Sequence, residues 1–392
     1  MGSLAVVAFI SPLHEGRVSL PKVDAVVKDL EDVGRLNLGK VDVLVALIMS
    51  GGVSRLVAGL AQQHNVARVI LASHPGNNSL ASALDAKALL GDLGVNVGLI
   101  HVDDEPSLVK AIEAGRAASR ILGSRVALLG VGDKGALGRR FEEAFRAHVD
   151  AIPMDAFEEA VEEAPIAEAE DFVRHIAARV RFRGVDLGKL IEVGKIYAAM
   201  RRLYRQYDAA AINCFPYLIK HRVTPCLALA RLNEEGLIAA CEADLRAVPL
   251  MLISRELTGY SGWIANVNHL SGNMLTISHC TIALNMVDEP TALTHFESGY
   301  EYGLTGRIKF REVTLASMSS DFKRAAVTRG VVAESGLLSS NVCRTQARIL
   351  VNFDLRSLAA KAPYNHHVMI PGNEADRVRA ILNALGIEVV EY

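Results

Sequence analysis

The sequence has 392 residues, of which 51% are hydrophobic and 5% aromatic, and its 42 Lys and Arg against 44 Asp and Glu give a formal net charge of −2. Because ordinary domains hold roughly 100–200 residues, we expect two or three of them. With no basic excess to neutralise phosphates and few aromatic side chains to stack on bases, nucleic acid is not an expected partner.

The cysteine pattern and the first residues bear on the compartment. Five cysteines are scattered along the chain without a C-x-x-C pair, which is typical of reduced thiols in a cytoplasmic protein rather than of a disulfide frame or zinc knuckle. The run Leu4–Ile10 lacks a basic lead and predicts a first β-strand rather than a signal peptide. Since no apolar run reaches the roughly 18 residues that a membrane span needs, no membrane partner is expected.

The first part of the chain, residues 1–122, alternates short apolar runs with helical patterns. Helices are predicted at Ser54–Gln63 and Leu80–Leu93. Continuous apolar strands with helices between them indicate a parallel sheet that is covered on both faces. In such sheets ligands bind beyond the carboxyl ends of the strands, where three polar turns follow at residues 11–17, 50–54 and 74–79. The predicted strands are Leu4–Ile10, Val41–Met49, Ala67–Ala72 and Val95–His101.

A second α/β domain is predicted over residues 123–248. Its strands include Val126–Gly130 and Ala209–Asn213. The acidic, alanine-rich stretch Asp155–Asp171 is typical of a solvent-exposed helix pair or a linker and suggests no chemistry.

The character changes after Pro249, and residues 249–392 predict a β-rich, antiparallel third domain. An amphipathic helix at Glu374–Leu385 and a terminal strand close the chain. The predicted β runs are Gly262–Val267, Met274–Ser278, Arg307–Leu315, Arg348–Phe353 and His367–Ile370.

Residues Gly130–Gly135 match G-x-G-x-x-G directly after a predicted strand, as a dinucleotide-binding turn would. The match is weak, because no acidic residue ends a convincing next strand. A flexible turn between strand and helix explains the glycines equally well.

A carboxylate pair follows a short apolar run near the middle of the chain. Glu242 and Asp244 are two residues apart, so in an extended segment both lie on one face. Carboxylates at a strand end are suitable ligands for Mn²⁺ or Mg²⁺. The alternative is that one of them caps a helix that starts near Leu245.

Three histidines follow or begin β runs. His279 on its own is typical of a hydrogen-bonded core histidine. In the pair His366-His367 the two imidazoles of a strand point to opposite faces, so only one of them enters a given site. A histidine paired with a distant carboxylate is a common metal-site pattern, but the sequence does not show that they meet.

Other polar residues suit a small polyol without requiring one. Arg344 enters a β run, where it either holds a substrate oxygen or makes a structural pair. Arg17, Asn77 and Asn78 lie in the strand-end turns of the first domain, where ordinary turn chemistry is the alternative explanation.

Taken together, several short motifs resemble the L-fucose isomerase and L-arabinose isomerase superfamily, in particular its short, archaeal-type fucose isomerase-like members. The resemblance covers the chain in outline, and its motifs are more specific in the C-terminal half. The residues that carry it are Ser11–Arg17, Pro225–Ala228, Ala240–Asp244, Ser278–Cys280, Cys343–Thr345 and Asn365–His367.

The resemblance implies two Rossmann-like or flavodoxin-like parallel-sheet domains, a barrel-like β-rich C-terminal domain, and a homo-oligomer, trimer or hexamer. It also implies a Mn²⁺ site or another divalent cation, held by two carboxylates and one histidine, at which an aldose and a ketose interconvert through an enediol. Glu242 matches the first carboxylate, which in the family also moves protons between C1 and C2, His367 matches the histidine, and His279 a histidine near the site. From their own chemistry, the candidate sugar contacts are Arg17, Asn77, Asn78, His279 and Arg344.

The position expected for the second carboxylate holds Asn266. An amide oxygen can bind a metal or orient an oxygen, but it does not accept a proton at neutral pH. Three alternatives remain. Asp244 or a metal-bound hydroxide accepts the proton instead, the protein catalyses a different reaction, or it has lost catalysis. We therefore carry three hypotheses: a metal-dependent sugar isomerase-like enzyme, a non-catalytic carbohydrate-binding relative, and a nucleotide-dependent oxidoreductase that uses Gly130–Gly135.

Overall fold

The computed structural model describes residues 2–390, which form two compact units. The first unit comprises residues 2–123 together with the C-terminal segment Ala375–Val389, and the second comprises Ser124–Glu374 and Val390. The division into three domains that the sequence suggested stays a prediction. Within residues 2–390, no helix is both long and apolar enough to span a membrane.

The first unit is built on a five-stranded, all-parallel sheet in the order β2-β1-β3-β4-β5. This is the strand order of flavodoxin-like folds. All six residues of β3 are buried, as expected of a central strand covered on both faces. The strands are β1 (Leu4–Phe9), β2 (Ala25–Val27), β3 (Val43–Ile48), β4 (Arg68–Ser73) and β5 (Asn96–His101).

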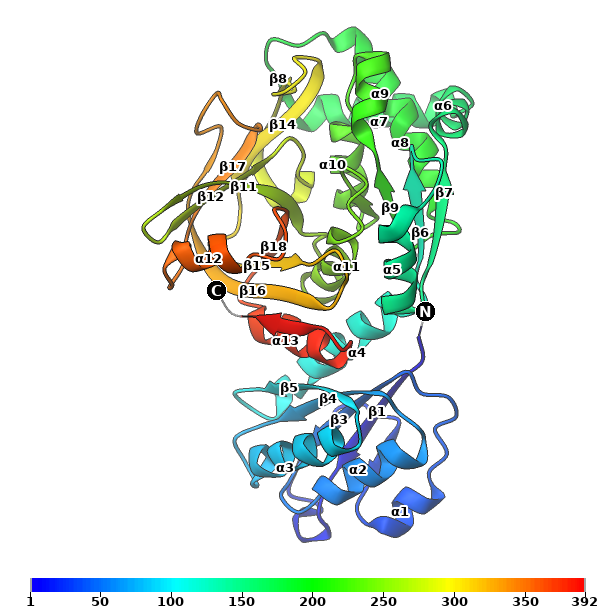
Figure 1. Ribbon diagram of the computed structural model, residues 1–392, viewed down its shortest axis with the longest axis vertical. Helices are drawn as coiled ribbons and strands as arrows, with labels where there is room; N and C mark the ends of the chain where they lie inside the picture. The colour runs from blue at the N-terminus through cyan, green and yellow to red at the C-terminus, as the bar shows by residue number, and fades with distance from the viewer. Residues whose placement is uncertain (1, 391–392) are drawn as a thin grey trace. The chain divides into compact units, whose positions relative to one another are not determined.

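Helices cover both faces of this sheet: α1, α2 and α3 lie along one face and α4 and α13 along the other (Figure 1). The C-terminal helix α13 packs closely on β5, where a Cβ added to Gly98 would lie 2.0 Å from the carbonyl oxygen of Ala380. Only glycine allows this approach. The helices are α1 (Leu30–Arg35), α2 (Ser54–Gln63), α3 (Ser79–Asp92), α4 (Val109–Ile121) and α13 (Ala375–Ala384), with single 3₁₀ turns at Pro12–His14 and Pro106–Leu108.

The second unit begins with a four-stranded parallel sheet in the order β10-β9-β6-β7, made of β6 (Arg125–Leu129), β7 (His148–Ile152), β9 (Ala209–Ile212) and β10 (Ile238–Ala240). The acidic stretch that the sequence marked as a helix pair is indeed α6 and α7. The helices here are α5 (Gly135–Phe145), α6 (Met154–Glu162), α7 (Ile166–Arg179), α8 (Leu190–Leu203), α9 (Cys214–His221), α10 (Cys226–Glu234) and α11 (Ala247–Thr258), with a 3₁₀ turn at Leu187–Lys189.

Gly130 follows β6 in the glycine-rich turn and has a structural reason to be glycine. Its φ is +77°, a left-handed conformation, and an added Cβ would lie 2.5 Å from Cε of Met154. Helix α5 then begins at Gly135. The turn between strand and helix thus accounts for the first glycine of the motif without a bound nucleotide.

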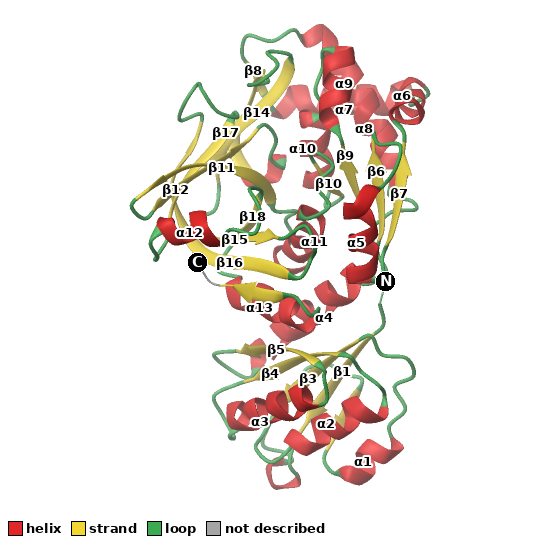
Figure 2. Ribbon diagram, in the orientation of Figure 1, coloured by secondary structure: helices red, strands yellow, loops and turns green. Residues whose placement is uncertain are grey.

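The largest sheet of the second unit forms a closed six-stranded antiparallel barrel in the order β15-β18-β11-β12-β17-β16, in which β16 pairs back onto β15. Figure 2 shows these strands on one side of the unit and most of its helices on the other. The predicted fold class, parallel α/β sheets followed by a barrel-like β-rich part, is confirmed. The strands are β11 (Trp263–Ser271), β12 (Met274–His279), β15 (Glu312–Met318), β16 (Arg324–Gly336), β17 (Thr345–Leu350) and β18 (His367–Pro371).

One β run of the sequence analysis is wrong as a single strand. The stretch 307–315 is divided between β14 (Glu301–Ile308), which belongs to a small sheet in the order β14-β13-β8, and β15 of the barrel. The chain bends at residues 309–311, where Lys309 N donates to the carbonyl oxygen of Met286 and the carbonyl oxygen of Arg311 accepts from Val332 N, so the two halves pair with different strands. The remaining elements are β8 (Arg181–Phe182), β13 (Val287–Thr294), a 3₁₀ turn at Leu284–Met286, α12 (Leu355–Lys361) and β19 (Glu388–Val390).

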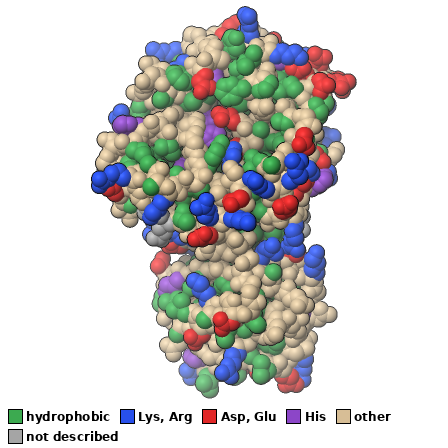
Figure 3. All heavy atoms as spheres, viewed as in Figure 1, with side chains coloured by type: hydrophobic (Ala, Val, Ile, Leu, Met, Phe, Trp, Pro, Cys, Tyr) green, Lys and Arg blue, Asp and Glu red, His purple; other side chains and the backbone are tan. Residues whose placement is uncertain are grey.

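Charged side chains do not gather into one patch on the face seen in Figure 3, where both signs are interspersed. This agrees with the formal net charge of −2. On that face there is therefore no continuous basic patch to which a polyanion would bind.

Candidate metal centre

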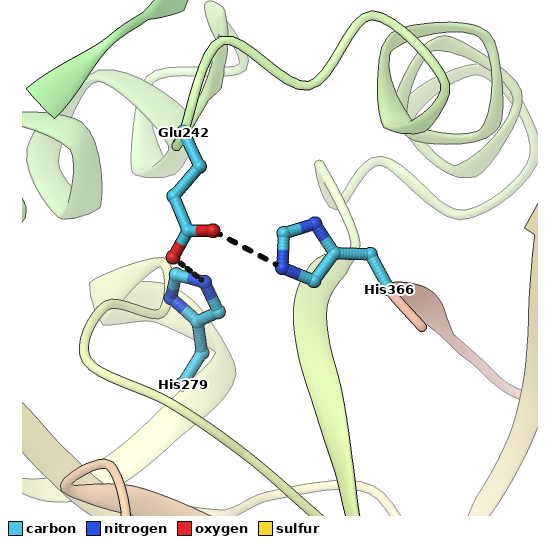
Figure 4. A group of neighbouring side chains, drawn as sticks. All are labelled: Glu242, His279 and His366. Carbon is cyan, nitrogen blue, oxygen red and sulfur yellow. Dashed lines mark ion pairs between the residues drawn. The ribbon is translucent and has the colours of Figure 1, made fainter. Parts of the chain in front are cut away.

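Three side chains of the second unit converge: Glu242, His279 and His366, whose potential ligand atoms all lie within 4.8 Å of one another (Figure 4). Glu242 follows the carboxyl end of β10, His279 is the last residue of β12, and His366 directly precedes β18. The group therefore lies where the parallel sheet and the barrel of this unit meet.

A strained turn presents the carboxylate. Glu242 and Ala243 both have left-handed backbones, with φ of 56° and 51°, although neither is glycine. Such a conformation costs about 1–3 kcal/mol per residue and is typical of functional sites. The turn is held by hydrogen bonds from Ala243 N to the carbonyl oxygen of Ile212, 2.8 Å, and from Asp244 N to that of Cys241, 3.1 Å. The fold keeps Glu242 in this conformation through those bonds.

His279 is buried, and neither of its ring nitrogens has a hydrogen-bond partner. Its Nε2 lies 3.4 Å from Oε1 of Glu242, which is an ion-pair distance without the geometry of a hydrogen bond. Leaving a buried polar group unsatisfied costs about 1–3 kcal/mol. An imidazole that faces a carboxylate in this way fits a role as a metal ligand, because a bound cation would take up the free lone pair.

His366 completes the group from the barrel side. Its Nε2 lies 3.5 Å from Oε2 of Glu242, and its Nδ1 lies 2.8 Å from Oδ2 of Asp244. The rings of His366 and His279 stand nearly perpendicular, with centroids 5.6 Å apart. Both Nε2 atoms thus face the same carboxylate from different directions, as ligands of one ion do.

The charges of the group support one another. Burial by itself raises the pKa of Glu242, but the neighbouring imidazole of His279, with smaller contributions from His366 and His295, lowers it overall. Burial likewise lowers the pKa of His279, and the neighbouring carboxylate outweighs it, so that this pKa is raised. Without a cation, the two groups hold each other in their charged forms. One carboxylate and two imidazoles suit a range of divalent transition metals and leave coordination positions for water or substrate.

His367, which the sequence analysis expected as the ligand, lies outside this group. It is fully buried in β18, and its Nδ1 lies 3.0 Å from the carbonyl oxygen of Asn365. Burial lowers the pKa of His367 to about 4, so it is neutral in the folded protein. The strand alternation that puts one imidazole of the pair into a site and the other away from it was anticipated, and His366 is the one that faces Glu242.

Asn266 is also outside the group. It lies on β11, where its Oδ1 accepts a hydrogen bond from Nδ2 of Asn365, 2.5 Å away, while Oδ1 of Asn365 accepts one from Val267 N, 3.1 Å away. Asn266 therefore fixes the segment that leads to His366.

Arg344 is engaged by the chain itself. Its Nε donates to the carbonyl oxygen of Thr294 at 2.8 Å and its Nη1 to that of Ser340 at 3.5 Å, and the guanidinium lies 5.7 Å from the ring centroid of Phe296. These contacts correspond to the structural alternative that the sequence left open for this residue.

The other three residues that were predicted to contact a sugar lie in the first unit. Arg17 is exposed in the loop after β1. Asn77 and Asn78 adopt left-handed backbones before α3, and the carbonyl oxygen of Asn77 accepts a hydrogen bond from Gly51 N at 2.7 Å. Their part in sugar binding stays a prediction.

Asp244, considered from the sequence as a proton acceptor, lies behind His366 and is buried. The sequence analysis missed this contact. The spacing of Glu242 and Asp244 drew attention to the second carboxylate, but nothing in the sequence identified His366 as its partner.

Comparison with known proteins gives a limited similarity. The chain is 27% identical over 136 residues to proteins named sulfoquinovose isomerase from Priestia aryabhattai and from Priestia megaterium. The matched stretch covers 32% of this chain, and the chain spans 30% of the length of each relative. No family model matches the sequence.

Proposed function

We propose that the protein is a metal-dependent sugar isomerase-like enzyme that interconverts an aldose and a ketose. The observation that carries the proposal is the buried His279, whose two ring nitrogens lack partners although a carboxylate and a second imidazole face it. The similarity to sulfoquinovose isomerases supports the reaction class over about a third of the chain.

Glu242, His279 and His366 would hold the cation, with Mn²⁺ as the expected ion. When bound, a divalent cation stabilises the negative charge that develops on the carbonyl and hydroxyl oxygens of the sugar. The chain itself supplies one ionised carboxylate at this place, because the pKa of Glu242 is lowered. Glu242 is thus the group that we assign to proton transfer between C1 and C2.

The absence of a second carboxylate from the group sets the expected limits of catalysis. Asn266 occupies the position where the resemblance expects one, and its side chain is hydrogen-bonded to Asn365. A positioned general acid or base contributes typically 10²–10⁴-fold to a rate. We therefore expect slow turnover of a small sugar, with proton transfer dependent on Glu242 alone.

The lack of a second carboxylate in the group also favours a second candidate function, that of a non-catalytic carbohydrate-binding relative. In that case the cation and its three ligands would bind the hydroxyls of a sugar without moving protons. Binding of a sugar in the presence of Mn²⁺ with no conversion under any condition would identify this candidate.

Elemental analysis of the purified protein, followed by a screen of aldoses and ketoses with Mn²⁺ present, tests the proposal. The screen includes neutral, phosphorylated and sulfonated sugars, because the relatives act on a sulfonated one by name. A copurified divalent ion and conversion that Glu242→Gln abolishes would support the isomerase. Equal turnover by metal-free protein would refute it.

A further inference from the structure

We propose that Asp244 is a positioning residue that keeps His366 in one tautomer, with the proton on Nδ1 and the lone pair of Nε2 directed at Glu242. Its Oδ2 lies 2.8 Å from Nδ1 of His366, and the Nε2 of the same ring lies 3.5 Å from Oε2 of Glu242. The functional meaning of this contact depends on the metal site proposed above.

The chemistry of the partner sets the tautomer. A carboxylate that is paired with a guanidinium accepts hydrogen bonds and donates none. Oδ1 of Asp244 already accepts from Nε of Arg246 at 2.7 Å and from Arg246 N at 3.0 Å. The contact with Oδ2 is therefore favourable only if Nδ1 of His366 carries a proton. In the neutral ring the proton is then on Nδ1, and Nε2 is the atom available to a cation.

The carboxylate itself is held rigidly. Its side chain is 1% exposed. The guanidinium of Arg246 also donates from Nη1 to Oγ of Ser320 at 3.2 Å and lies 3.6 Å from the ring centroid of Tyr364. That ring in turn stands edge-on to His366, with centroids 5.6 Å apart. Asp244 thus has no freedom to turn away from the imidazole.

The backbone near His366 is fixed independently. Oγ of Ser317 donates to the carbonyl oxygen of His366 at 2.8 Å and to that of Tyr364 at 3.1 Å. The main chain therefore sets where the imidazole is, and Asp244 sets which nitrogen faces inward. Since Asp244 and Glu242 belong to one turn, the same strained segment supplies both a ligand and the residue that orients another ligand.

A carboxylate behind a ligand histidine raises its basicity and fixes its ring, and its loss typically lowers metal affinity 10–100-fold. In Asp244→Asn the side chain can still accept a hydrogen bond, but it can also present its amide donors to Nδ1, and the ion pair with Arg246 is lost. We expect the tautomer of His366 to become mixed and Mn²⁺ affinity to fall 10–100-fold.

The first test is nuclear magnetic resonance of metal-free wild-type protein with ¹⁵N-labelled histidine, at a pH above neutrality. The signals of His366 are those that disappear in His366→Gln. The proposal expects the Nδ1–H tautomer in the wild type and a shift away from it in Asp244→Asn. The Nε2–H tautomer in the wild type would overturn the proposal, and this result needs no Asp244 variant to fold.

The second test measures Mn²⁺ affinity by calorimetry for the wild type, Asp244→Asn and the control Glu235→Gln. Glu235 is a partly buried carboxylate outside the group that is likewise paired with guanidinium groups, at 3.0 Å from Arg201 and 2.8 Å from Arg231. Weaker binding in Asp244→Asn alone is the expected result, and equal binding in all three would contradict it. If the wild type binds no metal, the proposed function fails. The role of Asp244 is then still decided by the tautomer of His366 that the nuclear magnetic resonance experiment measures.

Discussion

Nε2 of His279 lies 3.4 Å from Oε1 of Glu242, although one residue ends a strand of the barrel and the other follows a strand of the parallel sheet. Ligands of parallel sheets bind beyond the carboxyl ends of the strands, and β10 ends two residues before Glu242. The barrel brings its histidines to that edge. Each part of the unit on its own would have an incomplete site.

Metal should stabilise the protein through His279. At a Mn²⁺ concentration one hundred times the dissociation constant, the free energy of unfolding of the wild type should rise by about 2.7 kcal/mol. His279→Leu should lose this response. In the metal-free state the same variant should differ little in stability from the wild type, because it removes both an imidazole without hydrogen bonds and the charge contact of that imidazole with Glu242. Thermal unfolding with and without Mn²⁺ measures both effects.

His269→Leu is the matched control, since His269 is exposed on β11 and lies outside the group. It should keep the full response to Mn²⁺. A response that survives in His279→Leu would show that the ion is held elsewhere.

The two adjacent histidines should separate metal binding from stability. His366→Gln should abolish stoichiometric metal, because it removes one of three ligands. His367→Gln should retain the metal and instead lower the free energy of unfolding by about 1–3 kcal/mol, since His367 is fully buried in the core. Metal content by elemental analysis and chemical denaturation give the two readouts. If metal is lost only in His367→Gln, then His367 is the ligand, as the sequence analysis expected.

Much of the fold could be predicted because the strands of a parallel sheet are continuous apolar runs. Helix α2 was expected at Ser54–Gln63 and is found there, and the runs that became β1, β3, β4 and β5 were each found to within about two residues. Strand β2 has only three residues and no such run, so periodicity could not find it. The boundary between β14 and β15 was missed because the apolar pattern continues across it, although the two strands belong to different sheets.

The site was less accessible from the sequence than the fold. Glu242 and the histidine pair could be selected by chemistry, but which imidazole faces the carboxylate depends on where β18 begins, and a shift of one residue reverses the faces. His279 looked like a core histidine because burial is visible in sequence and a missing hydrogen-bond partner is not. The contact between Asp244 and His366 spans 122 positions and follows only from the tertiary structure.

A pH-dependent contribution to stability is expected from Glu158, which joins α6 to α9. Nζ of Lys220 donates to its Oε2 at 2.5 Å and Nε2 of His221 lies 2.8 Å from its Oε1. These contacts lower the pKa of Glu158 from its ordinary value of 4.5. The stabilisation is therefore complete above that value and is lost as the pH falls through the lower folded-state pKa.

Glu158→Gln should cost about 0.5–1 kcal/mol at neutral pH, the range of a partly exposed ion pair, and nothing in strong acid. Denaturation curves across the acid range measure the difference from the wild type. Glu159→Gln makes the same change at the next, exposed position of α6 and should have no such pH dependence. A Glu158 effect that stays constant with pH would mean that packing, not charge, is responsible.

Asn266→Asp asks whether the missing second carboxylate limits catalysis. Oδ1 of Asn266 accepts a hydrogen bond from Asn365, and a carboxylate can accept the same bond, so the variant should fold with a change in stability of less than about 1 kcal/mol. Since Asn266 lies outside the group of ligands, we expect turnover and Mn²⁺ affinity to change less than tenfold. Asn266→Leu, which loses the hydrogen bond, is the matched structural control. A rise in turnover of about 10²-fold or more in Asn266→Asp alone would mean that this position reaches the reacting atoms and that Glu242 does not act alone.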